Sequence, residues 1–258
     1  MRLITYNVEY FEGINKRWKY LEIQKYFRIA KKNIKKVCAF LDELKPDIVG
    51  LVEIDTNPLH EDGHSTMKTV ASFLNMPYCV SKNKYSRKAI YKILNHAPIL
   101  RKHANAIISR YPLFDSKFYY LSKGVKRLLI HSKVKIANEG EVKELHLFVV
   151  HLSLRKKTRD IQIRDLSTIL RASPSPKILF GDFNNFKGIE EITPLLDYSN
   201  LIDAVEYSNQ EHSKTYPSWK PKKHLDHIFV SKDIKILNYE VLDCDLSDHK
   251  PVMIDFEL

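Results

Sequence analysis

The stretch Lys177-Ile178-Leu179-Phe180-Gly181-Asp182-Phe183-Asn184 joins a short apolar run to a group of polar side chains. Its first half is typical of a buried strand, so the polar residues should lie where that strand ends. The same arrangement occurs at three other strands and polar residues: Leu3 to Tyr6 with Asn7, Asp47 to Val52 with Glu53, and Leu145 to Val150 with His151. A fifth polar group, Ser247-Asp248-His249, lies near the carboxyl end.

Together these groups contain the side chains that metal-assisted cleavage of a phosphoester needs. A hard cation such as Mg²⁺ prefers oxygen ligands and takes few protein carboxylates. The candidate oxygen ligands are Asn7, Glu53, Asp182, Asn184 and Asp248. An activated water and donors for the developing charge can come from imidazoles near a carboxylate. His151 and His249 are the candidates, with Asp226, next to His227, as a possible orienting partner.

A series of motifs along nearly the whole chain resembles the endonuclease/exonuclease/phosphatase superfamily, which includes deoxyribonuclease I, the exonuclease III type of abasic-site endonuclease and neutral sphingomyelinases. The motifs are Thr5-Tyr6-Asn7, Leu51-Val52-Glu53, Asn105-Ala106-Ile107-Ile108-Ser109-Arg110-Tyr111-Pro112, His151-Leu152, Gly181-Asp182-Phe183-Asn184, Leu225-Asp226-His227-Ile228 and Ser247-Asp248-His249-Lys250-Pro251. A single motif of this kind could be an ordinary turn after a strand. Their shared order and spacing make the resemblance specific.

The resemblance implies an α/β fold, a four-layer α/β sandwich of two packed mixed β-sheets flanked by helices. In such a fold the loops at the strand ends converge on one rim. The chain has 258 residues, 44% of them hydrophobic, which is enough to bury one α/β core. We therefore expect a single domain over residues 1–258.

The resemblance also implies a role for each candidate residue, with Mg²⁺ or Mn²⁺ as the cofactor. The metal site would contain Asn7, Glu53 and Asp248. The catalytic residues would be His151, Asp182, Asn184, Asp226 and His249. Further candidates for substrate binding are Asn105, Arg127, Tyr216 and Trp219; the last two are an aromatic pair flanked by cations that could stack on a base, hold a head group or pack a loop. Asp226 would fix the tautomer of His249. Whether Asp182 or His249 activates the water stays open at this point.

His151 separates the branches of the superfamily. The deoxyribonuclease I and sphingomyelinase branches typically carry histidine in this His-Leu motif, where it can protonate the leaving oxygen, whereas abasic-site endonucleases typically use tyrosine. The first motif, Tyr6-Asn7-Val8-Glu9-Tyr10, and the segment Val52-Glu53-Ile54-Asp55 also differ from the repair enzymes. The sequence therefore argues against specific abasic-site cleavage.

The formal net charge of +11 indicates a polyanionic partner, either nucleic acid or an anionic membrane lipid. From Gly63 to Arg110 there is no acidic residue. Cations and tyrosines in this segment could hold phosphates and stack on bases. Its apolar stripe, Ile90, Ile93, Leu94 and Ala97, could instead lie on a lipid surface or pack on the core. Arg155, Lys156, Lys157 and Arg159 should add positive charge to the same rim as His151.

Other features of the sequence indicate the cellular compartment in which the protein is expected. Cys38, Cys79 and Cys244 are well separated and show no metal-ligand spacing, so a reducing compartment is expected. The first predicted strand starts at Arg2, which leaves no room for a leader, and no apolar run is long enough to span a bilayer. We expect a cytoplasmic protein without an obligate protein partner.

The remaining pattern predicts the elements between the motifs. Helices are expected over Arg17 to Leu44, Ser65 to Leu74 and Ile161 to Leu170. Further strands are expected around Tyr78 to Val80, Leu128 to Ile136, Glu144 to Val150, Asp226 to Ser231, Ile234 to Leu242 and Pro251 to Phe256.

The favoured function is a metal-dependent phosphodiesterase, a nuclease acting on DNA or RNA. The alternative is a phospholipid or sphingomyelin-type phosphodiesterase on the same catalytic core. A non-catalytic binding module ranks third, because no catalytic side chain of the family pattern is missing here. DNA binding that falls steeply with salt would favour the nuclease, and binding to lipid vesicles would favour the alternative.

Overall fold

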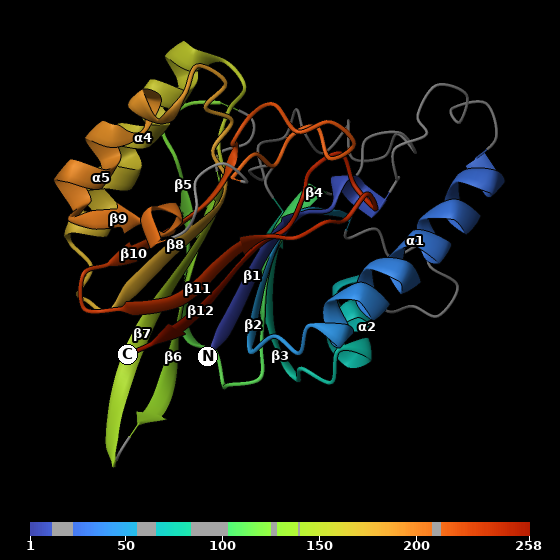
Figure 1. Cartoon of the computed structure of the whole chain (residues 1–258), viewed down its shortest axis with the longest axis horizontal. Coiled ribbons are helices and arrows are strands. Elements are labelled where there is room, and N and C mark those ends of the chain that lie inside the picture. The colour runs from blue at the N-terminus through green and yellow to red at the C-terminus, as the bar shows by residue number, and fades with distance from the viewer. Residues whose placement is uncertain (12–22, 56–65, 84–102, 125–127, 139, 208–212) are drawn as a thin grey trace.

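The computed structural model describes residues 1–11, 23–55, 66–83, 103–124, 128–138, 140–207 and 213–258. Its strands form two mixed six-stranded sheets (Figure 1). The first sheet has the order β11-β12-β1-β2-β4-β3, with β1 Arg2–Asn7, β2 Ile48–Asp55, β3 Tyr78–Asn83, β4 His103–Ser109, β11 Lys235–Val241 and β12 Val252–Glu257. The second has the order β5-β6-β7-β8-β10-β9, with β5 Phe114–Tyr120, β6 Leu128–Asn138, β7 Glu141–His151, β8 Lys177–Asp182, β9 Leu201–Asp203 and β10 Asp226–Ser231.

Each sheet contains one parallel pair at its centre. In the first sheet β1 runs parallel to β2, and in the second β7 runs parallel to β8, while the other pairings are antiparallel. Because parallel strands end at the same edge, the carboxyl ends of β1 and β2 lie together, as do those of β7 and β8. Strand β1 contacts β8 and β10 across the sandwich. This arrangement places the ends of the central strands of both sheets close to one another.

Helices cover the outer face of each sheet (Figure 1). Helices α1 (Ile23–Glu43) and α2 (Thr66–Phe73) lie on the first sheet, and α4 (Lys156–Arg171) and α5 (Thr193–Ser199) on the second. On α1, Ile34, Val37, Cys38 and Leu41 recur at helical spacing and are buried, which explains why this face packs on the sheet. Short 3₁₀ helices η1 (Glu9–Phe11), η3 (Ile189–Glu191) and η4 (Ala204–Tyr207) connect the larger elements.

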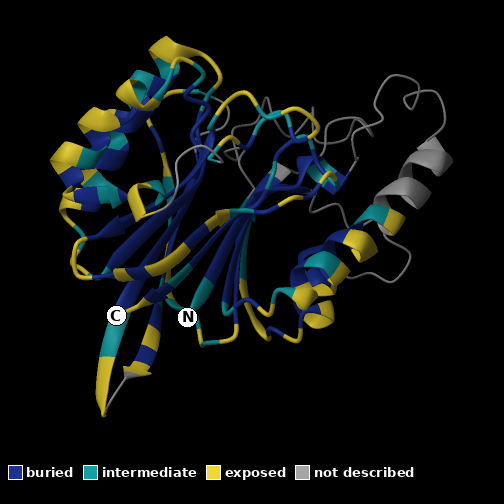
Figure 2. Ribbon diagram, viewed as in Figure 1, coloured by how far each residue is buried: buried dark blue, intermediate teal, exposed yellow. Residues whose placement is uncertain are grey.

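Three apolar clusters fill the spaces between the layers. One lies between the sheets and includes Leu3, Ile107, Phe180 and Ile228. The others lie between each sheet and its helices. Figure 2 shows the strands as largely buried and the outward faces of the helices as exposed. The predicted four-layer α/β sandwich of two packed mixed sheets is therefore confirmed.

Several details differ from the expectation. No strand was expected at β4, β5 or β9, although the Asn105 motif lies in β4, and no helix was expected at α5. Strand β5 is an edge strand with mostly exposed side chains, so it lacks a clear alternation of apolar residues. Helix α5 has only seven residues, too few to show helical spacing. The first residues of the helix expected from Arg17, and the basic stretch over 84–102, lie outside the described residues.

Among the described residues, no helix combines the length and the apolar character needed to cross a membrane.

Candidate active site

The predicted polar residues gather at one rim of the sandwich. Asn7 is the last residue of β1, and His151 and Asp182 are the last residues of β7 and β8. His151 and Asp182 are direct neighbours in the parallel ladder. Asn7 Nδ2 donates to Asp182 Oδ2 at 3.0 Å and so joins the two sheets. Strand β10 runs antiparallel to β8, and its first residue, Asp226, pairs with Asp182.

Asp182 joins several of these groups, because besides Asn7 it contacts Asn184 and His151. Its Oδ1 accepts from the backbone N–H of Asn184 at 2.9 Å, and its Oδ2 lies 3.3 Å from His151 Nε2. Asn184 Nδ2 donates to the carbonyl of Leu152 at 3.0 Å, which fixes the amide next to the His-Leu motif. Gly181 precedes this turn at a φ of 136°, and any side chain there would collide with the carbonyl of the neighbouring strand. The Gly-Asp-Phe-Asn sequence therefore fits the local backbone.

Glu53 reaches the rim through a bulge in β2. The ladder between β2 and β4 shifts register between Leu51 and Ile54, and Glu53 has a φ of 59°. A left-handed backbone is unusual for glutamate, and bulges redirect side chains near functional sites. Glu53 Oε1 lies 3.6 Å from His151 Nδ1, so the ring of His151 stands between the carboxylates of Glu53 and Asp182.

His249 is held by a second carboxylate. Its Nδ1 lies 2.7 Å from Asp226 Oδ2, and the Thr215 hydroxyl donates to the same oxygen at 2.6 Å. Burial alone would lower the pKa of His249, but the charge and the hydrogen bond of Asp226 raise this pKa to about 10. The carboxylates of Asp182 and Asp248 act in the same direction.

The donor atoms fit a hard divalent cation. One oxygen of Asp182 and one of Asp226 lie within 4.8 Å of each other and of a ring nitrogen of His249, whose protonated ring would not itself be a ligand. The Glu53 carboxylate contacts His151, and the Asn7 amide contacts Asp182. Because His151 and Asp182 are neighbours, both groups lie at the same part of the rim. A set rich in carboxylate oxygen is the environment that Mg²⁺ and Mn²⁺ prefer.

Asp248, a predicted metal ligand, lies beside this group. The three side chains that cluster closely are those of Asp182, Asp226 and His249, and they do not include Asp248. The backbone carbonyl of Asp248 accepts from Ser218 N at 2.9 Å. The neighbouring Ser247 hydroxyl donates to the carbonyl of Asn7 at 2.7 Å. The role of Asp248 as a metal ligand stays a prediction.

Three of the four predicted substrate-binding residues, Asn105, Tyr216 and Trp219, lie in the described part of the chain. The ring of Tyr216 lies next to that of His249, with centroids 4.9 Å apart, and Trp219 is 55% exposed three residues further on. Asn105 is fully buried in β4, where its Nδ2 donates to the carbonyl of Leu128 at 3.4 Å. Arg127 lies outside the described residues. Of the three residues that the structure describes, Tyr216 is the one whose ring lies next to a predicted catalytic side chain, that of His249.

Arg159 differs from the expectation of a cation on the rim. It is 2% exposed, and its guanidinium donates to both carboxylate oxygens of Glu191, at 2.7 and 2.8 Å. It also donates to the carbonyls of Ser153 and Leu154, just after His151. Its charge is therefore neutralised in the interior. The helical spacing to Ile163 would have placed Arg159 on the buried face of α4.

Thr215 was also missed as a functional candidate. It holds Asp226 from a loop eleven positions earlier, and its hydroxyl accepts from the backbone N–H of Leu225 at 3.2 Å. Nothing in the local sequence marks this contact, because it forms only when the loop folds back against the strand.

The fold and the rim define a class: a two-sheet α/β sandwich that collects carboxylates, amides and imidazoles where its central strands end. The model of the Endonuclease/Exonuclease/phosphatase family matches residues 4–249, and this chain belongs to that family. The resemblance drawn from the sequence motifs is thus confirmed. Members of the family are hydrolases of phosphoesters and generally use divalent metals.

Individual relatives agree with this family. The uncharacterized protein YbhP of Escherichia coli (strain K12) is 25% identical over 224 residues, which cover 82% of this chain and 83% of YbhP. The endonuclease/exonuclease/phosphatase from Beutenbergia cavernae DSM 12333 has a TM-score of 0.75 at 15% identity, covering 100% of this chain and 71% of that chain.

Two further solved structures carry a stated activity or ligand. D. rerio TDP2 complexed with single strand DNA product has a TM-score of 0.68 at 16% identity, covering 100% of this chain and 99% of that chain. The Bacteroides thetaiotaomicron VPI-5482 mannosyl-6-phosphatase has a TM-score of 0.69 at 17% identity, covering 100% of both chains. At these identities the likeness establishes the fold alone.

Proposed function

We propose that this chain is a divalent-metal-dependent phosphodiesterase, a nuclease that hydrolyses DNA or RNA. The observation that carries the proposal is the meeting of Asn7, Glu53, His151, Asp182, Asp226 and His249 at one rim. Glu53, with the amide of Asn7 and the carboxylate of Asp248, would hold Mg²⁺ or Mn²⁺, which when bound would neutralise charge on the phosphate.

The chain's own side chains can carry the protons of the reaction. Because the pKa of His249 is raised to about 10, its ring is protonated at neutral pH and suits a phosphate oxygen that gains negative charge. Asp182 is then the acceptor for the proton of the attacking water. His151 would protonate the leaving oxygen, the role that the family resemblance implies. Since His151 Nε2 lies 3.3 Å from Asp182 Oδ2, the proton gained by Asp182 can return to His151 after each turnover.

Nucleic acid is the substrate class that the charge and the aromatic residues favour. The net charge is +11, and Tyr216, whose ring lies next to His249, and the exposed Trp219 belong to a segment with Lys220, Lys222 and Lys223. Aromatic rings stack on bases of any sequence, and lysines neutralise phosphates. A relative of the same fold, D. rerio TDP2, is known in complex with a single-stranded DNA product.

The test is a substrate panel with the purified chain. Plasmid DNA, single-stranded DNA, RNA, an abasic duplex, a phospholipid and a bis-aryl phosphodiester are each incubated with Mg²⁺, Mn²⁺ or EDTA. We expect cleavage of nucleic acid and of the bis-aryl phosphodiester that requires the metal. Glu53→Ala, Asp182→Ala and His249→Ala should each abolish it in a folded protein. Hydrolysis of the phospholipid alone would replace the nuclease by the lipid alternative, and full activity in EDTA would refute a metal-dependent site.

A further inference from the structure

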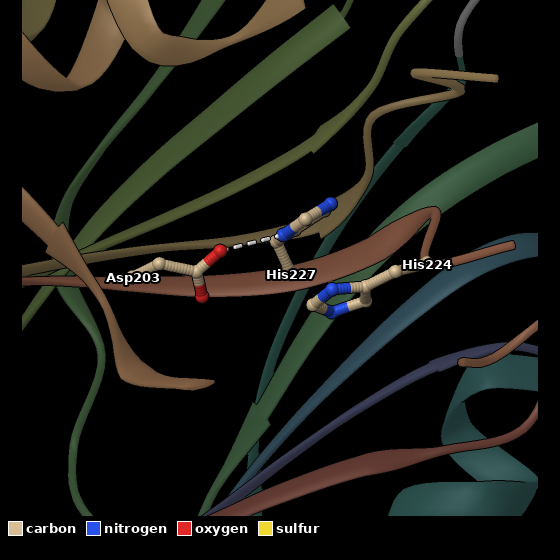
Figure 3. Close-up of side chains that lie close together, drawn as sticks. All are labelled: Asp203, His224 and His227. Carbon is tan, nitrogen blue, oxygen red and sulfur yellow. Dashed lines mark hydrogen bonds and ion pairs between the residues drawn. The ribbon is translucent and has the colours of Figure 1, made fainter. Parts of the chain in front are cut away.

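A second group of metal-ligand side chains lies outside the candidate active site. It consists of Asp203, His224 and His227, and one ligand atom from each lies within 4.8 Å of the others (Figure 3). Asp203 ends β9 and His227 lies in β10, at the edge of the second sheet, where η4 contacts β10 and β11. Successive strand residues face opposite sides of a sheet. Asp226 therefore turns toward His249, and His227 turns to the other face of β10.

The hydrogen bonds around His227 leave one position to be filled. Asn185 Nδ2 donates to the carbonyl of Gly188 at 3.3 Å, so the amide oxygen of Asn185 is the atom that faces His227 Nε2, also at 3.3 Å. Since an amide oxygen only accepts, Nε2 must carry a hydrogen. The other ring nitrogen, Nδ1, lies 2.9 Å from Asp203 Oδ2. Two ligand atoms of one Zn²⁺, each about 2.0 Å from the ion, lie little farther apart than this, so a small movement of the Asp203 carboxylate lets both atoms bind one cation.

His224 adds a second imidazole to this position. Its ring stacks on that of His227, with centroids 3.9 Å apart and 27° between the ring planes. The Tyr239 hydroxyl lies 3.3 Å from His224 Nε2 and adds a further oxygen to the group. A hollow of about 510 Å³ is lined by Asp203 and His224. It is the side from which an ion would reach the cluster.

We propose that Asp203, His224 and His227 bind a transition-metal cation of the Zn²⁺ class, at a site separate from the candidate Mg²⁺ site. Two imidazoles and a carboxylate are a ligand set for Zn²⁺, with a further position open to water, whereas Mg²⁺ prefers oxygen alone. The Asn185 amide oxygen is the outer partner that a metal-bound imidazole usually has. Asn185 directly follows Asn184, so an ion at this site would also hold the turn that carries the candidate catalytic amide.

The test is calorimetric titration of the metal-free protein with Zn²⁺ in excess Mg²⁺. The candidate active site can also take Zn²⁺, so four proteins are compared: the unchanged chain, Asp182→Asn, His224→Gln and the double variant. We expect Asp182→Asn to retain one Zn²⁺ equivalent and the double variant to lose it, with affinity for this equivalent at least about tenfold lower once the His224 imidazole is removed. His146→Gln, which removes an imidazole elsewhere on the same sheet, should leave Zn²⁺ binding unchanged.

A spectroscopic readout distinguishes a metal from a proton. Nitrogen NMR of ¹⁵N-histidine protein reports whether His227 Nδ1 carries a hydrogen, and circular dichroism confirms that each variant is folded. We expect the Nδ1 signal to change when Zn²⁺ is added to Asp182→Asn. A hydrogen on Nδ1 that persists in saturating Zn²⁺, or Zn²⁺ binding equal in Asp182→Asn and in the double variant, would show that Asp203 and His227 form an ordinary ion pair and would overturn the site.

Discussion

At the scale of single residues, the contact between Asp226 and His249 controls the charge of the candidate active site. Asp226 is 1% exposed, and His249 Nδ1 and the Thr215 hydroxyl both bind its Oδ2. A buried carboxylate that accepts two such bonds orients the imidazole and favours its protonated form. Replacement of this carboxylate should therefore change the protonation of His249 as well as its position.

Asp226→Asn tests this role. An amide retains the size of the carboxylate but not its charge, so the pKa of His249 should fall from about 10, and kcat should fall on the order of 10³-fold. If protonated His249 supports the reaction, activity is lost as the pH rises and this ring loses its proton. The loss should occur at a lower pH in the variant than in the unchanged chain. A pH profile of kcat on a bis-aryl phosphodiester measures this shift, and Thr215→Ser, which retains the hydroxyl, is the control. An unchanged profile would remove His249 from the mechanism.

Trp219→Ala separates substrate binding from chemistry. Trp219 is 55% exposed, so its loss should leave the fold unchanged, and stacking on a base contributes about 1–3 kcal/mol. We expect KM for single-stranded DNA to rise by about tenfold or more, with no change in kcat on the small bis-aryl substrate. Tyr207→Ala, another exposed aromatic residue, is the matched control. Equal KM values for both variants would exclude Trp219 from the substrate site.

The candidate residues could be found from the sequence, but their supporting contacts could not. Asn7, His151 and Asp182 each follow an apolar run, and this position marks a strand end without knowledge of the fold. The bond from Thr215 to Asp226 has no such mark, since it depends on the path of the loop that brings Thr215 back to β10. The assigned roles of these residues stay predictions until variants are measured.

At the scale of elements, the strands that carry the candidate site were largely predictable from the sequence. The short elements that pack around them were not. Strand β10 has the predicted bounds, Asp226–Ser231, because an apolar run follows the Leu225-Asp226-His227 motif directly. Strand β9 has three residues and α5 has seven, and such short elements depend on their neighbours rather than on their own pattern. Their positions are fixed by packing on β10 and α4.

Helix α4 anchors the loop after His151 through a buried ion pair. Arg159 and Glu191 have side-chain exposures of 2% and 5%, and Arg159 also holds the carbonyls of Ser153 and Leu154. Removal of one partner leaves an uncompensated buried charge, so Arg159→Met should lower the free energy of unfolding by about 3–5 kcal/mol. Urea unfolding measures this loss.

Two variants control for this measurement. Arg159→Met combined with Glu191→Leu removes both charges and should lose less stability than Arg159→Met alone. Lys156→Ala breaks an exposed ion pair with Asp160 on the same helix, and its effect should stay below about 1 kcal/mol. If Arg159→Met is as stable as Lys156→Ala, the buried pair does not support the loop.

At the scale of the whole molecule, the candidate site exists only because the two sheets close on each other. Asn7 belongs to the first sheet and Asp182 to the second, and their side chains meet at 3.0 Å. Asn7 and His249 are far apart in the sequence, so the site forms only in the folded sandwich. We propose that residues 1–258 act as one domain. Any condition that loosens the core between the sheets should therefore also disperse the site.

Lower pH should instead loosen the other face of the second sheet, where a buried pair of histidines lies beside Phe148. His131 Nε2 lies 3.0 Å from His146 Nδ1, and the ring of His131 also stacks on Phe148. Burial, the neighbouring imidazole and the charges of Lys117 and Lys133 lower the pKa of His131 from 6.5 to about 4. Burial is also the main cause that lowers the pKa of His146. In the folded state both rings are therefore held in the neutral form.

Because the folded-state pKa of His131 is below the unfolded value, the unfolded chain binds the proton more readily. The contribution of this ring to stability is complete above pH 6.5 and is lost as the pH falls toward about 4. We expect Tm to decrease over this interval and His131→Gln, which cannot titrate, to decrease less steeply. The slopes are best compared above about pH 5, where most carboxylates stay ionised. Thermal unfolding at a series of pH values decides the matter: parallel slopes for the two proteins would show that protonation of His131 does not limit the stability of the sandwich.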